Sequence, residues 1–131
     1  MSFATGRIVL TIVAVIFGLS SIPAELSRSH VFNPSWPGHA RYHVVTYLVM
    51  NIAACTVALL LLWDANSTRL ARQGACGLLL AAEAALFLAA VFPGTSARAD
   101  GEPLLLRQPI SLWMGGLLCV ATVLGTIGIL S

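Results

Sequence analysis

The chain carries three histidines, and all of them lie within one fourteen-residue stretch, at His30, His39 and His43. Imidazole suits proton transfer near neutral pH, and two histidines four residues apart share a helix face. Glu83 is the second chemically suggestive residue, because it interrupts the apolar run 74–92. A carboxyl group inside a membrane span is by default a candidate functional group. We therefore expect His43 to act as general base, with Glu83 as partner acid and His39 orienting substrate or shuttling protons.

A polar stripe connects these residues to others. If a helix begins after Pro37, steps of four residues lead from His39 through Tyr47 to Asn51 and carry polar groups into the membrane. Unsatisfied polar groups are costly in lipid, so the stripe should face an interior cavity. We expect Glu83 to share that cavity, about 13 Å below the membrane surface on the side of the histidines. The expected substrate-binding residues are Asn51, Tyr47, Trp36, Asn33, Arg41, His30 and Glu25.

Other interpretations of the same residues stay open. The histidines can form an interfacial belt bonded to loop carbonyls, and Glu83 can be a structural link to a neighbouring helix. His39 and His43 also have the spacing of a metal chelate, which Glu83 or His30 would complete. H-x-x-x-H lacks the glutamate of the zinc-protease signature, so hydrolytic zinc chemistry is not supported. We expect no cofactor and do not favour a catalytic metal.

Long apolar segments must position these groups. The chain of 131 residues is 58% hydrophobic and 9% charged, whereas soluble domains average about 25% charged residues. A membrane-spanning helix needs roughly 20 apolar residues. The pattern predicts one all-α domain over residues 1–131, an integral membrane four-helix bundle with an ordered loop at 25–41. The expected spans are 6–25, 42–63, 72–92 and 109–130.

The spacing of small residues and the net charge indicate what the helices pack against and which partners the chain can bind. Gly77, Ala81, Ala85 and Ala89 recur every four residues, which predicts close helix packing inside the bundle. The lipid bilayer is the main expected partner, and a homo-oligomer stays open. The net charge of +2 is too small and dispersed for a nucleic-acid footprint.

The arginines bear on orientation. Three lie on the side of the termini and four on the other, so their number does not decide the topology. Arg7 with the free amine, and the close pair Arg69 and Arg72, favour termini in the cytoplasm by the positive-inside rule. We expect a bacterial inner membrane location.

One motif carries a family resemblance. Residues 30–43 read HVFNPSWPGHARYH. Together with the four-span plan, this motif resembles small four-helix membrane proteins of the DoxX-like group, including a bacterial and fungal set with an HxFNPxWPGHARYH-like sequence. Some DoxX-like bundles are associated with quinone-linked redox chemistry, and the related vitamin K carboxylase membrane core handles a hydroquinone. The resemblance implies a lipophilic, quinol-like substrate, by analogy of fold alone.

Two functions follow as hypotheses. The first is a membrane enzyme that uses His/Glu acid–base chemistry on a quinol, quinone or isoprenoid, by oxidation, epoxidation, isomerisation or cyclisation. The second is a small transport or accessory subunit in which Glu83 is a proton or ion site. An enclosed pocket bordered by the histidines and Glu83 would favour the enzyme, and a continuous polar path would favour transport.

Overall fold

Four helices make up most of the structure. The computed structural model describes residues 2–97 and 103–131. Two short antiparallel strands, β1 (Leu104–Leu105) and β2 (Gln108–Pro109), precede the last helix. The fold is the expected all-α four-helix bundle. Its helices are α1 (Phe3–Glu25), α2 (Gly38–Trp63), α3 (Arg69–Ala90) and α4 (Ile110–Leu130).

Three helices begin three or four residues before the expected spans. The reason is capping, which apolar runs do not reveal. The Ser2 hydroxyl accepts a hydrogen bond from the Thr5 backbone N–H at 3.2 Å, and Thr68 does the same for Ala71 at 3.1 Å. Pro37 sits at the N-cap position of α2, where its fixed φ suits a helix start.

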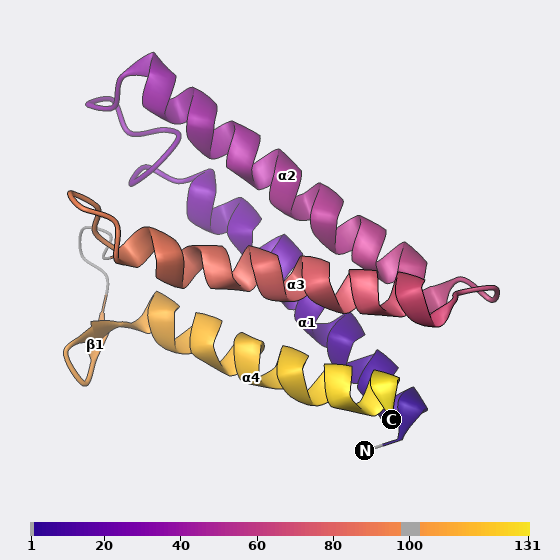
Figure 1. The fold of residues 1–131 in the computed structure, drawn as a ribbon. Helices are drawn as coiled ribbons and strands as arrows, with labels where there is room; N and C mark the ends of the chain where they lie inside the picture. The colour runs from indigo at the N-terminus through magenta and orange to yellow at the C-terminus, as the bar shows by residue number, and fades with distance from the viewer. Residues whose placement is uncertain (1, 98–102) are drawn as a thin grey trace.

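The helices pack in the ring order α1, α2, α3, α4, with α4 closing onto α1. Figure 1 shows both termini at one end of the bundle, together with the turn between α2 and α3. The loop after α1 and the segment after α3 lie at the opposite end, and α2 diverges from α4 toward that end (Figure 1). One end of each of the four helices therefore lies at that end of the bundle.

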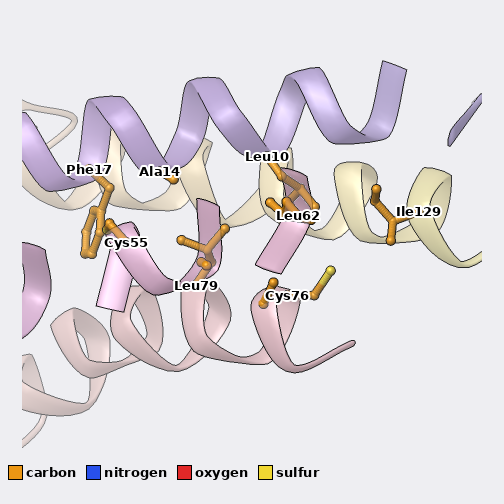
Figure 2. Packing of buried hydrophobic residues seen from close by; sticks show 10 residues of the cluster. Leu10, Ala14, Phe17, Cys55, Leu62, Cys76, Leu79 and Ile129 are labelled. Carbon is orange, nitrogen blue, oxygen red and sulfur yellow. The ribbon is translucent and has the colours of Figure 1, made fainter. Parts of the chain in front are cut away.

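The core is a narrow apolar seam along the bundle axis. In α2 the buried positions alternate in steps of three and four, which is the spacing of packed helices. Figure 2 shows Phe17, Cys55 and Leu79 as members of one cluster drawn from α1, α2 and α3. The buried residues of α2 are Leu48, Asn51, Cys55, Ala58 and Leu62.

Glycines bring α1 and α4 into close contact. A Cβ placed at Gly6 would lie 2.7 Å from the Gly125 carbonyl oxygen, so only glycine fits there. The expected small-residue face of α3 does not pack in this way. A Cβ at Gly77 would meet nothing within 4 Å, and the alanines of that face are exposed. That prediction of bundle packing was wrong, because α3 packs through the face of Leu79 and Glu83 instead.

The outer surface of the bundle is apolar. One example from each helix is Leu19, Met50, Leu88 and Leu117, whose side chains are 60%, 66%, 68% and 70% exposed. Soluble proteins rarely expose apolar surface on this scale. All four helices are also long and apolar enough to cross a membrane. The chain is thus suited to a bilayer, as an integral membrane protein.

Candidate functional site

A pocket of about 860 Å³ lies at the bundle end opposite the termini. Pockets that bind small molecules have volumes of about 300–1,000 Å³. Five of the seven expected binding residues line it: Glu25, His30, Asn33, Trp36 and Tyr47. The apolar wall comes from α3 and α4, at Ala85, Leu86, Ala89, Ala90 and Leu112.

Serine hydroxyls and an aromatic ring hold His30 in this pocket. Its Nδ1 lies 3.0 Å from the Ser29 Oγ and 3.3 Å from the Ser27 Oγ, and the two hydroxyls are 2.8 Å apart. The Trp36 ring meets the imidazole edge-on, with ring centres 5.5 Å apart. Both hydrogen-bond contacts given for this imidazole are at Nδ1, which leaves Nε2 as the nitrogen that a ligand would use.

The loop that carries His30 is fixed from α2. Arg41 donates hydrogen bonds from Nη2 to the carbonyl oxygens of Asn33 at 2.9 Å and Pro34 at 3.4 Å. The Asn33 side chain accepts from the backbone N–H and the hydroxyl of Ser35, an Asx turn that suits this proline-rich segment. Arg41 does not itself line the pocket. In this structure its guanidinium braces the loop.

Glu25 and Tyr47 complete the polar part of the pocket. Both side chains are partly buried, one at the end of α1 and the other on α2. The Glu25 carboxyl group lies within electrostatic range of both the His30 imidazole and the Tyr47 phenol. A carboxyl, an imidazole and a phenol therefore gather beside an apolar wall.

His39 and His43 lie outside this pocket. Both are exposed on the first turns of α2, and their Nε2 atoms are 2.9 Å apart. Each four-residue step rotates about 40° around a helix, so a stripe that is buried at Asn51 has turned outward by the time it reaches the histidines. The expectation that they share an interior cavity with Glu83 was wrong for this reason.

Glu83 is fully buried between helices and does not line the pocket. The Thr122 hydroxyl donates a hydrogen bond to its Oε1 at 2.8 Å, which ties α3 to α4. The Cys119 thiol is another polar neighbour of the carboxyl group. Its Oε2 has no O–H or N–H partner among the described residues. The carboxyl group is therefore only partly satisfied in a low-dielectric core.

Asn51 is buried against a different helix. Its Nδ2 donates to the Ser21 hydroxyl at 3.2 Å and to the Phe17 carbonyl at 3.4 Å, both on α1. Its Oδ1 is buried with no hydrogen-bond partner among the described residues. Asn51 thus links α2 to α1, whereas Glu83 links α3 to α4. The two were expected at one depth in one cavity, but each serves a separate helix pair.

Several partners of these residues were not anticipated. Ser27 and Ser29 orient His30, and Thr122 and Ser21 bond to the two buried polar side chains. The sequence does indicate the role of the two serines, because the pattern Ser-x-Ser-His places two hydroxyls next to an imidazole. Thr122 carried no such signal, because a threonine in a span commonly bonds to a carbonyl of its own helix, as this one also does.

Neither a metal centre nor a relative identifies the site. Across residues 2–97 and 103–131, no three His, Cys, Asp or Glu side chains are grouped to hold a metal ion. No protein-family model, no curated protein and no solved structure matches the chain. The resemblance to the DoxX-like group therefore stays a prediction, and the pocket is the feature that bears on function.

Proposed function

We propose that this chain is an integral membrane enzyme that binds a lipophilic small molecule in the end pocket and acts on it by acid–base chemistry. One observation carries the proposal. Glu25, His30 and Tyr47 meet an apolar wall in a single pocket of about 860 Å³. Sites of this kind, mostly apolar with a few convergent polar groups, are the usual form of small-molecule sites. The histidine and acid are those of the pocket, not His43 and Glu83.

The position of the pocket favours an amphipathic substrate. Glu25 ends α1 and His30 follows it in the loop, so these groups lie where the bilayer gives way to water. The apolar wall runs from Ala85 to Ala90, which covers about 7.5 Å along α3 toward the membrane interior. A molecule with a polar ring or head and an apolar chain, such as a quinol or an isoprenoid alcohol, matches both parts.

Proton transfer is the chemistry that these groups support. The Glu25 carboxylate would accept a proton from carbon or from a phenol oxygen, and His30 would return one from Nε2 to a second position. The serines at Nδ1 fix the imidazole plane, and the Tyr47 hydroxyl would stabilise a developing oxyanion. Isomerisation and cyclisation need nothing further. Oxidation or epoxidation would need an electron acceptor or oxygen donor from a partner.

The proposed activity can be tested by measuring the chemical conversion of membrane lipids by the purified protein. Purified protein is incubated with a total membrane lipid extract, and products are separated by chromatography and mass spectrometry. An isomerase produces a component of unchanged mass and new retention time. His30→Gln and Glu25→Gln should each slow this conversion by about 10²-fold or more. His43→Gln is the matched control, because that histidine is exposed outside the pocket. Equal losses in all three variants would contradict the assignment.

A second candidate function has its own observation. Glu83 Oε2 and Asn51 Oδ1 are buried oxygens without hydrogen-bond partners among the described residues. Such oxygens suit a proton or cation site in a small transport or accessory subunit. Proton or cation flux into proteoliposomes that is lost in Glu83→Gln and kept in His30→Gln would favour this function over the enzyme.

We also propose a bacterial inner membrane location with cytoplasmic termini. Arg7 and Arg72 lie at the end of the bundle that carries the termini, and the Arg7 guanidinium stacks 4.2 Å from the Trp63 ring centre. Tryptophan is typical of either membrane interface, and arginine near short loops favours the cytoplasmic one. Green fluorescent protein fused after Ser131 should fluoresce, because it folds in the cytoplasm. A dark fusion in an intact membrane-inserted protein would reverse the orientation.

A further inference from the structure

His39 and His43 form an imidazole pair that the proposed function does not use. Helix α2 has 26 residues and is therefore about 39 Å long, whereas the hydrocarbon core is about 30 Å thick. The apolar part, 44–63, fills that thickness, so the first turns extend into the headgroup and water region. Both histidines are exposed there, where dissolved ions have access.

The two imidazoles form a bent hydrogen bond between their Nε2 atoms. The Nε2 atoms are 2.9 Å apart, and the ring centres of His39 and His43 are 4.4 Å apart. A straight N–H···N bond of that length would separate the ring centres by about 5.1 Å, because each nitrogen lies about 1.1 Å from its ring centre. The shorter distance means that the contact is bent, so at least one of the two nitrogens does not point straight at the other.

The two separations also match two neighbouring ligand positions around a metal ion. With metal–nitrogen bonds of about 2.05 Å at 90°, the nitrogens would be about 2.9 Å apart and the ring centres about 4.5 Å apart. Both values agree with the observed pair. Tetrahedral angles would instead require about 3.3 Å between the nitrogens. The spacing of the pair is thus closer to that of a square or octahedral site than to that of a tetrahedral one.

Tyr42 supports this arrangement. Its ring stacks on His39, with centres 6.5 Å apart and planes inclined by 12°, and it meets His43 edge-on at 5.5 Å. These contacts restrict both imidazoles and reduce the rotamer entropy that a metal would otherwise have to overcome.

We propose that His39 and His43 form a bidentate surface site for a divalent late transition metal, with Cu²⁺ and Ni²⁺ preferred over Zn²⁺. Imidazole is a ligand that these ions favour, and tetragonal geometry is typical of Cu²⁺ and Ni²⁺. Water completes the coordination sphere, since the described residues offer no third ligand of the His, Cys, Asp or Glu type. The site lies outside the pocket and stands independently of the proposed enzyme.

The experiment uses the full chain in detergent, purified without a histidine tag and titrated with CuSO₄. Electron paramagnetic resonance should show one Cu²⁺ with two imidazole nitrogens. His39→Gln and His43→Gln should each weaken Cu²⁺ binding about tenfold or more, because even the loss of an outer-shell group costs a metal site 10–100-fold. His30→Gln is the matched control and should bind as the wild type does. Calorimetry with NiSO₄ and ZnSO₄ should give tighter binding of Ni²⁺ than of Zn²⁺.

Two results would overturn the proposal. One is a wild-type spectrum without two-nitrogen coordination, which needs no variant and so does not depend on how variants fold. The other is unchanged Cu²⁺ affinity in the His39→Gln/His43→Gln double variant, which would assign the ion to another group such as the terminal amine. Thermal unfolding of each variant checks that the exposed substitutions leave the bundle intact.

Discussion

Replacing Gly6 by alanine tests the contact between α1 and α4. The new Cβ would lie 2.7 Å from the Gly125 oxygen, 2.9 Å from the Gly128 carbonyl carbon and 3.0 Å from the Ile129 nitrogen. All three are backbone atoms, so no side chain can rotate away. Ordinary contact begins near 3.4 Å, and the helices would have to separate by about 0.7 Å at this point. Overpacking of this kind costs about 1–3 kcal/mol.

The matched controls are two other helical glycines. Gly77→Ala introduces a Cβ into open space and should leave stability unchanged or raise it slightly, by up to about 1 kcal/mol from helix propensity. The stability of Gly18→Ala should lie between those of the Gly6 and Gly77 variants, because its Cβ would meet the Cys55 side chain at 3.3 Å. Unfolding in mixed micelles, titrated with a denaturing detergent, gives the free energies. Equal stability of the Gly6 and Gly77 variants would refute the packing of α1 on α4.

Two further predictions concern polar contacts. Thr122→Val should lower the free energy of unfolding by about 1–3 kcal/mol, because it removes a donor from the buried carboxyl of Glu83. Thr56→Val, at an exposed site, should change stability by less than about 0.5 kcal/mol, and equal effects would contradict this reasoning. Arg41→Gln should speed backbone hydrogen exchange in residues 30–37 by removing the brace of that loop, and unchanged exchange there would show that the brace is not needed.

The four-helix architecture could be predicted because the apolar composition that indicates it extends over long segments of the chain. Four apolar runs separated by short charged patches leave few alternatives to a four-span bundle. The grouping of Glu25, His30 and Trp36 in one pocket matches the expected binding set, because a proline-rich loop must fold back over the end of the helix that precedes it.

The expected meeting of His43 with Glu83 was wrong, and the sequence alone offered no way to correct it. A sequence gives the angle of a side chain around its own helix, but not the rotation of that helix against its neighbours. Glu83 faces Thr122 on α4, and the first turns of α2 face outward. Arg41 was expected to stabilise a substrate oxygen, and its hydrogen bonds to the loop could not be foreseen, because only the folded loop defines the direction of the carbonyl groups.

The most direct test of the central claim is native mass spectrometry of the protein released from its own membranes. The account predicts a bound lipophilic molecule in the wild type. It should be lost in Ala85→Trp, which fills the pocket, and kept in Ala84→Trp, an exposed neighbour on α3 that does not line it. A wild-type protein without such a molecule, or an Ala85→Trp variant that retains it, would contradict the assignment of this pocket as the functional site.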